Sequence, residues 1–436
     1  MKTVGQRVKE KRKALGLTQG ELSGLHLSRG MVSLIERDQT TPSIKTLEHI
    51  AKKLGVPVSE LLGESSLTNE KQDDIYIDIN EIKRIINMSN ALLKAGEYSN
   101  IQEILQNISL PKDLIFYNGP VKKILGLVEL KKSNYKKAIE LLNESLLYYS
   151  PLEGKDHISL YYYLSECYKQ TNSYHLAIEN SLYGSILLKS KHYEEDVLLH
   201  LKILYNLAYC YCRIGEYKKG LEVIYESFNL MKESQLHYSQ GYFYMLKGIA
   251  ELYLKSYSEG IISTNKALEL LDNKQDTKEV IGCLTNLGIL YRNVKKYDES
   301  LIYLKKSLIY SEQLELDWLL LNNLYEIMLT CYKLKNYVLL ESYADRALLT
   351  HHPYLDLKTK ILIVLARFKL EQDMDGEALT YINQAEKITR KLNNTVLEAQ
   401  SYNIKADIFI KQGNFQEANQ LLQKSNDLLL TMCSDY

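Results

Sequence analysis

Very few residues in this chain of 436 residues have types and spacing that suit covalent or metal chemistry. Cys210 and Cys212 lie two positions apart, but no second pair of ligands accompanies them, so we interpret them as small core residues. The adjacent His351 and His352 precede Pro353 in an expected turn. No glycine-rich phosphate loop, H-E-x-x-H or G-x-S-x-G motif is present. We therefore predict that the chain is not an enzyme and holds neither a metal nor a cofactor.

The charged residues are distributed unevenly, in a way that favours binding chemistry at one end. Residues 1–65 carry eleven Lys or Arg against seven Asp or Glu, a net +4, whereas the remainder carries a net −4. A basic end on an acidic body indicates contact with phosphate. The six cysteines follow no disulfide framework, no apolar run could span a bilayer, and the first residues contain no signal-peptide core. We expect a cytoplasmic protein with no membrane contact.

The basic end is expected to form five short helices between residues 2 and 63. The first ends at Gly16 and has one stripe of residues, which comprises Val4, Val8, Lys11 and Leu15. Thr18 and Glu21 form a capping box at the start of the second helix, and Ser28 caps the third, residues 29–37. The fourth covers residues 44–54 and the fifth residues 57–62. A tight turn at Gly24 between the second and third helices is helix-turn-helix geometry.

The residues of this segment resemble a known family. LTQGELSGLHLSRGMVSLIERDQTTPSIKTLEHIAKKLGVPVSELL resembles the Xre/Cro-type helix-turn-helix from end to end, because LTQ, the S-R-x-x-V-S-x-I-E run, TPS, TL and LGV occur in order. The segment between Leu22 and Ser28 is one residue shorter than in the commonest pattern of that family. The resemblance implies that the third helix reads double-stranded DNA.

In that third helix Val32 and Ile35 are expected to pack inward, which leaves the opposite face for the DNA groove. Arg29 is the predicted base contact, since a guanidinium can bond two acceptors of guanine at once. Gly30, Met31 and Leu34 share its face. Phosphate contacts through side chains, backbone amides and helix N-termini are predicted at Gln19, Ser28, Arg37, Thr40, Thr41 and Ser43. One head buries little DNA, so we expect two heads on a pseudo-palindromic operator.

The rest of the chain repeats a pattern about every forty residues. A turn residue, aromatic in all but one repeat, recurs at spacings between 37 and 43, at Tyr98, Tyr135, Tyr174, Tyr217, Tyr257, Tyr297, Tyr337, Asp375 and Phe415. A residue that is usually small lies nine positions earlier, as at Gly126 and Gly288, and another lies ten positions later, as at Ser145. Locked offsets with drifting spacing predict nine copies of one unit, each made of two amphipathic helices joined by a short turn.

These units resemble tetratricopeptide repeats, as in Asn286-Leu287-Gly288-x-x-Tyr291 followed by Tyr297-x-x-Ser300. The resemblance implies an all-α fold in which the repeats form a right-handed solenoid and the first helices line an inner groove. By the register of that family, Lys169 faces the groove together with Tyr162, Tyr163, Lys202, Tyr205, Asn206, Tyr209, Arg213, Tyr242, Met245, Asn286, Arg292, Asn293, Asn322, Tyr325 and Glu326. Asn can clamp a peptide backbone, Tyr offers rigid apolar area, and Lys or Arg can hold a carboxylate.

An Xre-type head followed by nine such repeats resembles the RRNPP family of peptide-sensing regulators, and in length it is most similar to the neutral-protease-regulator (NprR) branch. The resemblance implies a helix-turn-helix domain in residues 1–65, a linker in 66–78, and a repeat domain in 79–436 that binds a short signalling peptide. A homodimer or tetramer is expected, with the apolar end Leu428–Cys433 as a dimer seam. Two alternatives stay open: a Rap-like inhibitor that binds a response regulator, alone or in addition, and a phage lysis–lysogeny regulator that responds to a peptide.

Overall fold

The structure, a computed structural model, describes residues 3–24, 27–56, 58, 61, 78–106, 108, 110, 112–149, 154–189, 196–271, 277–349 and 353–434. These residues are almost entirely helical, and their one extended feature is an isolated bridge between Gly24 and Leu27. The chain divides into two compact units, Met1–Tyr238 and Ser239–Tyr436. Most of the predicted linker, together with Cys433's side chain and the pair His351-His352, lies outside the described residues, so those predictions stay untested.

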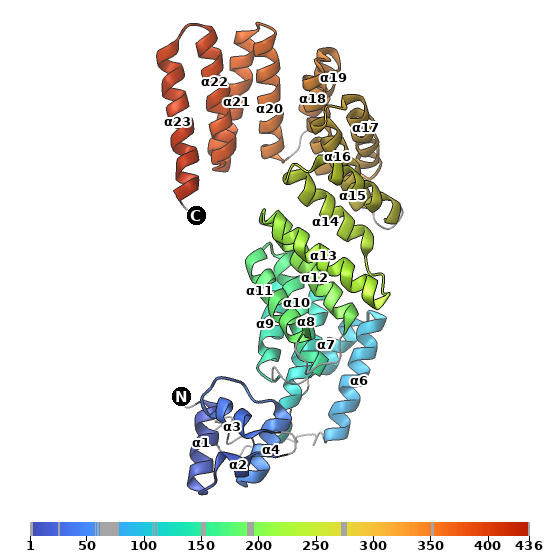
Figure 1. Cartoon of the computed structure of the whole chain (residues 1–436), viewed down its shortest axis with the longest axis vertical. Coiled ribbons are helices and arrows are strands. Elements are labelled where there is room, and N and C mark those ends of the chain that lie inside the picture. Colours follow the sequence, from blue (N-terminus) through green and yellow to red (C-terminus); the bar gives the residue numbers. More distant parts are fainter. Residues whose placement is uncertain are drawn as a thin grey trace. The chain divides into compact units, whose positions relative to one another are not determined.

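Four described helices form the head: α1 (Val4–Ala14), α2 (Gln19–Leu22), α3 (Arg29–Glu36) and α4 (Ile44–Leu54) (Figure 1). The capping box of α2 is present, with the Thr18 hydroxyl accepting from the Glu21 amide and the Glu21 carboxylate accepting from the Thr18 amide. Ser28 caps α3 as predicted. A Cβ on Gly24, in the turn between α2 and α3, would lie 2.6 Å from Nε2 of His49, so the His49 ring would have to move.

The head encloses one apolar core. Val8, Leu22, Val32, Ile35 and Ile50 are all buried, so the predicted inward positions on α3 are confirmed. The predicted stripe of α1 is wrong at its end, because Leu15 follows the last helical residue and is 53% exposed. A charged pair lies inside this head instead. Arg12 Nε is 2.5 Å from Oε1 of Glu36, and both side chains are buried.

The repeat body consists of nine consecutive helix pairs among the described residues, as the sequence predicts. The helices of each pair run antiparallel and pack side by side (Figure 1). The pairs are α6 (Ile79–Ala95) with α7 (Tyr98–Gln106), α8 (Asn118–Lys131) with α9 (Tyr135–Leu146), α10 (Gly154–Gln170) with α11 (Tyr174–Lys189), α12 (Val197–Arg213) with α13 (Tyr217–Ser234), α14 (Gln240–Tyr253) with α15 (Tyr257–Leu270), α16 (Thr277–Asn293) with α17 (Tyr297–Gln313), α18 (Asp317–Leu334) with α19 (Tyr337–Leu349), α20 (Leu355–Glu371) with α21 (Asp375–Leu392), and α22 (Thr395–Lys411) with α23 (Phe415–Ser434).

Each recurrent turn residue of the sequence is the first residue of a second helix. Two positions before it, the backbone always adopts a left-handed conformation, at Gly96, Ser133, Asn172, Gly215, Lys255, Lys295, Lys335, Asp373 and Gly413. This conformation ends the first helix and reverses the chain within a short turn. Only three of the nine residues are Gly, so most of the turns accept a conformational cost for side chains with a Cβ.

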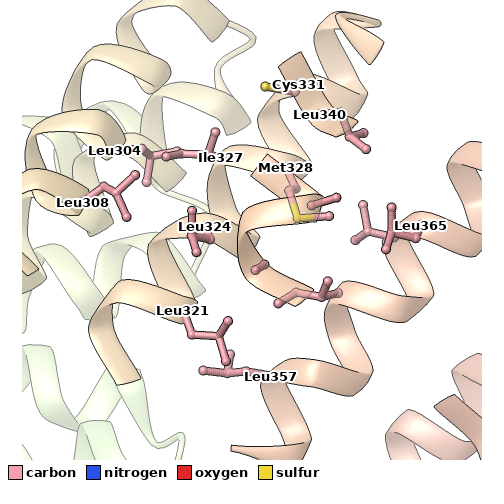
Figure 2. Close-up of a cluster of buried hydrophobic side chains, with 14 of the residues drawn as sticks. Leu304, Leu308, Leu321, Leu324, Ile327, Met328, Cys331, Leu340, Leu357 and Leu365 are labelled. Atoms are coloured by element: carbon pink, nitrogen blue, oxygen red, sulfur yellow. The ribbon is translucent and has the colours of Figure 1, made fainter. Parts of the chain in front are cut away.

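The small residues at fixed positions allow the two helices of each repeat to approach closely. A Cβ on Gly288 of α16 would lie 2.4 Å from Cγ of Leu304 on α17. In the compact unit Ser239–Tyr436, α18 packs on α17 and on α20 at the same time (Figure 2). Leu324 and Ile327 lie near Leu304 and Leu308 of α17, whereas Met328 points toward Leu365 of α20. Each repeat therefore buries its apolar surface against the repeats adjacent to it.

A short 3-10 helix, η1 (Lys112–Tyr117), belongs to two cores at once. Leu114 is buried in the core of the first repeats, and Tyr117 packs against the same core. Phe116 is buried at 3% exposure in the core of the head, with Ile115 packed beside it. The head core is thus completed by a residue that lies beyond the first helix pair in the sequence.

Candidate DNA-binding surface and ligand cavity

The predicted DNA-contacting residues divide into exposed and buried groups. Arg29, Gly30 and Arg37 are exposed, and Leu34 is 42% exposed despite its apolar side chain. Met31 is half-buried and packs against the head core, so only part of its side chain faces outward. The recognition helix α3 therefore presents a basic and apolar face to solvent, which suits base edges and thymine methyl groups.

The predicted phosphate contacts are less uniform. Ser28 and Thr41 are exposed and Thr40 is half-buried, which leaves them accessible to a phosphate. Ser43 is fully buried, and its Oγ accepts a hydrogen bond from the Thr46 amide, so it acts as the N-cap of α4. Gln19 donates its side-chain amide to Glu36 Oε2 at 2.9 Å. Contacts at Ser43 and Gln19 would therefore have to come from the backbone at the starts of α4 and α2.

The first unit contains a cavity of about 560 Å³ that is lined mainly by the first helices of four successive repeats. The first helices of these repeats thus line a common cavity, and their use as the inner wall of a binding groove stays a prediction. Six of the predicted groove residues gather in it. Its lining comprises Leu93, Leu127, Leu130, Lys131, Tyr135, Tyr162, Tyr163, Glu166, Lys169, Gln170, Lys202, Tyr205, Asn206 and Tyr238.

A polar network lies at the centre of this cavity. Lys169 Nζ is 2.7 Å from Oε2 of Glu166 and donates to Oδ1 of Asn206 at 2.8 Å. The same ammonium lies 5.5 Å from the ring centre of Tyr205, within reach of a cation–π attraction. Burial by itself raises the pKa of Glu166, but Lys169 and the hydrogen bond from Gln170 outweigh it and lower that pKa below its usual value. Glu166 is therefore a permanent anion at neutral pH.

Asn206 is the most buried member of the network, at 1% exposure. Its Nδ2 forms no well-aligned hydrogen bond, although Asn206 lies close enough to Glu166 to help lower the pKa of that carboxyl. A buried amide N–H without a well-formed bond costs about 1–3 kcal/mol.

Two predicted residues of α12 lie outside the cavity lining. Tyr209 is half-buried, with Lys169 5.6 Å from its ring centre. Arg213 is exposed and donates from Nε to the Tyr174 hydroxyl at 3.1 Å. The sequence did not single out Glu166, Lys131 or Tyr238. Glu166 could have been found from its position one turn before Lys169 on the same helical face.

The remaining predicted groove residues belong to the second unit. Tyr242 and Met245 of α14 pack against the core there, and Asn286 and Asn322 are half-buried. Asn293 bonds to the carbonyl of Ile289 in its own helix.

Two of these residues neutralise each other: Arg292 Nη2 is 2.6 Å from Oε2 of Glu326. Tyr325 is half-buried, with Lys360 5.9 Å from its ring centre. Arg292 and Glu326 thus pair with each other within the fold and are not available to a ligand. The cavity around Asn206 is therefore the stronger candidate for a ligand site.

Cysteine and metal chemistry give no competing site among the residues that the structure describes. Cys167, Cys210, Cys212, Cys283 and Cys331 are free and buried, and Cys210 and Cys212 are core residues as predicted. Burial raises the pKa of the Cys210 thiol to about 12, so it is protonated at neutral pH. No cluster of three or more His, Cys, Asp or Glu is placed to hold a metal, and no described helix has the length and apolarity to cross a bilayer.

Comparison with known proteins agrees with both halves of the chain. A helix-turn-helix family model matches residues 8–61, and a tetratricopeptide-repeat model matches residues 280–315. The immunity repressor protein of Bacillus phage phi105 is 40% identical over 104 residues, which cover 22% of this chain and 72% of that protein.

Two solved structures share the fold of the body. The apo form of the quorum sensor NprR from B. thuringiensis is 15% identical with a TM-score of 0.62, over 80% of this chain and 99% of that one. NprR in complex with its cognate peptide NprX is 16% identical with a TM-score of 0.50, over 83% and 99%. The chain belongs to the Xre-type helix-turn-helix family of DNA-binding proteins, and its repeat body has the fold of the quorum sensor NprR.

Proposed function

We propose that this protein is a cytoplasmic transcriptional regulator that binds operator DNA through its head and is switched by a short signalling peptide bound in the cavity around Asn206. The observation that carries the proposal is the presence, on one chain, of an exposed recognition helix and a cavity lined by Tyr, Lys and a buried Asn. The cavity volume of about 560 Å³ lies in the range of ligand sites. The likeness to a quorum sensor solved with its peptide supports the same function.

The switch is expected to work by population shift. A peptide that contacts several repeats stabilises one relative arrangement of neighbouring first helices over others, and its differential affinity sets the size of the change. A change in the first repeats is expected to reach the head because η1 contributes residues to both the head core and the core of the first repeats. Two heads on one pseudo-palindromic site require a dimer, and we place its seam at the C-terminal helix, where Leu429 and Leu430 are 40% and 66% exposed.

The experiment has two stages with the full-length chain. First, selection from random duplex DNA identifies the operator, and fluorescence anisotropy measures its affinity at fixed salt. Second, the same measurement is made with a mixture of short peptides present. We expect sequence-specific binding whose affinity changes with peptide.

Asn206→Ala should abolish the response to peptide while leaving operator affinity in its absence unchanged. Asn180→Ala is the matched control, since that amide bonds to the carbonyl of Leu176 on α11 and does not line the cavity. Absence of sequence-specific DNA binding would refute the proposed regulatory function. A peptide response that survives Asn206→Ala would refute the assignment of the peptide site to this cavity.

A further inference from the structure

The helix that precedes the recognition helix is only one turn long. α2 has four residues, and its C-cap, Ser23, has an extended backbone. The last carbonyls of a helix have no partner within the helix, so in so short an element they depend on donors from outside. The Gly20 carbonyl is satisfied locally, since it accepts from both the amide and the hydroxyl of Ser23. The carbonyls of Glu21 and Ser23 take their donor from another helix.

Lys53 of α4 supplies that donor. Its Nζ lies 2.8 Å from the carbonyl oxygen of Glu21 and also donates to the carbonyl oxygen of Ser23. An ammonium has three donors and no acceptor, so it can bridge two carbonyls at once. A positive charge is also favoured at the end of a helix, where the carbonyls point outward. Lys53 thus closes α2 in the place of a further helical turn.

The connection from there to the recognition helix is short. Gly24 and Leu27 exchange two backbone hydrogen bonds, at 2.8 and 3.1 Å, so the chain reverses between them. Ser28 then caps α3 directly. The segment between Leu22 and Ser28 is also one residue shorter than in the commonest Xre-type pattern. In such a connection the direction of the backbone at Ser23 largely decides where α3 begins.

Base readout depends on the placement of α3. A bidentate contact such as the one predicted for Arg29 requires two donors to meet two acceptors on one base, and such geometry has to be held within about 0.5 Å. Non-specific binding arises from charge and needs no such precision. A residue that fixes α3 relative to α2 is therefore expected to act on specificity more than on overall affinity.

We propose that Lys53 is a positioning residue for DNA recognition, which holds the end of α2 and thereby sets the placement of α3 and Arg29 in the groove. It acts through Arg29 and does not itself contact DNA. The inference rests on the proposed function, in which the head binds an operator. It adds a residue of α4, outside the helix-turn-helix itself, to the determinants of specificity.

The test uses the full-length protein with two duplexes, the selected operator and a random sequence of equal length, at a series of salt concentrations. Lys53→Met keeps the aliphatic stem and removes the donors, and because Lys53 is exposed its loss leaves no cavity. We expect operator affinity in anisotropy to fall about tenfold, within the range of one base contact. Affinity for the random duplex and the salt dependence of operator binding should stay the same.

Three further variants sharpen the result. Lys53→Arg should retain operator affinity, because a guanidinium can also donate to two carbonyls. In an Arg29→Ala background, Lys53→Met should cause little further loss, since the contact that it positions is already absent. Lys52→Met is the matched control, because it removes the same charge from the exposed neighbouring residue of α4. It should bind both duplexes as the wild type does.

The outcomes separate a positioning role from the alternatives. Equal loss on both duplexes, with a salt slope reduced by about one, would make Lys53 a phosphate contact and overturn the inference. Hydrogen exchange that accelerates throughout α1 and α3 of Lys53→Met would make Lys53 a general stabiliser of the head and overturn it too. Unchanged operator affinity in Lys53→Met would refute the inference and leave the proposed regulator standing. If the wild type prefers no DNA sequence, the proposed function fails and this inference fails with it.

Discussion

The buried ion pair of the head offers the sharpest test of how the DNA-binding surface is held. Arg12 bonds to both carboxylate oxygens of Glu36, at 2.5 and 3.0 Å, and donates to the carbonyl of Leu17 at 2.6 Å. These contacts join α1 to the end of the recognition helix. Arg12→Met leaves the buried carboxylate with Gln19 as its remaining hydrogen-bond partner and should cost ~3–5 kcal/mol. A domain of this size has a total stability of about 3–9 kcal/mol, so the head should lose most of its stability.

The assay must report on the head alone. Residues 1–65 contain no Tyr, Trp or Phe, so fluorescence gives no signal that is specific to the head. Hydrogen exchange of the full-length chain, read by mass spectrometry, resolves peptides from α1 and α3. We expect Arg12→Met to speed their exchange by about a hundredfold or more while peptides from α16 and α18 keep their rates. Lys13→Met, at the exposed neighbouring residue, is the control and should exchange as the wild type does.

A second substitution and a change of pH test the reasoning behind this magnitude. If the cost arises from an orphaned charge, Arg12→Met with Glu36→Leu should be less destabilised than Arg12→Met alone. Burial raises the pKa of Glu36, but hydrogen bonds from Arg12 and Gln19 outweigh it, so the folded pKa lies below the unfolded value of about 4.3. The stability from this group is therefore present above that pH and is lost as pH falls through the folded pKa.

Protection of the wild-type head should fall on acidification below about pH 4, and Glu36→Gln should remove that part of the dependence. Wild-type exchange rates in Arg12→Met would refute this account of the head.

Three further predictions concern the repeats and the DNA contact. Lys335→Gly should raise the free energy of unfolding of the second unit by up to ~1 kcal/mol, because Lys335 has a φ of 58° at a turn; urea unfolding followed by Trp318 fluorescence measures it. By the same assay Gly288→Ala should destabilise by ~1–3 kcal/mol through the overlap with Leu304, whereas Gly282→Ala on the same helix, with nothing within 4 Å, should be neutral or stabilising. Equal effects of the two glycine substitutions would contradict the close packing of α16 on α17. Arg29→Ala should weaken operator binding by ~1–3 kcal/mol in anisotropy and relax the preference at one base pair; a uniform loss across sequences would make Arg29 a phosphate contact instead.

The repeat architecture could be predicted because one offset pattern recurs along the chain. Every second helix begins at the residue that the spacing singled out, from Tyr98 to Phe415. The left-handed turn residues could not be predicted by type, since Lys255, Lys295 and Lys335 are not residues that favour this conformation. Their conformation is imposed by the packing of the two helices that they join.

The candidate sites were only partly predictable, for a different reason. Register placed Tyr162, Lys202 and Asn206 on one wall, and the structure brings them together in a cavity. Register does not show which charges neutralise one another. It did not predict that Arg292 and Glu326 form an ion pair, or that Arg12 is buried in the head against Glu36.

The folded head extends beyond the segment that matches the helix-turn-helix family, because Phe116 is buried in its core. The family match ends at residue 61, yet the apolar core of the head includes Phe116, with Tyr148 packed against it from beyond α9. Burying a Phe contributes roughly 1.5–3 kcal/mol, a large share for so small a domain. A head that is cut at the end of the family match, residue 61, therefore lacks part of its own core, and exchange of heads between related regulators at that boundary loses this stabilisation. A transplanted head keeps its stability only where the recipient body supplies an equivalent aromatic residue, so head and body are expected to coevolve at this position.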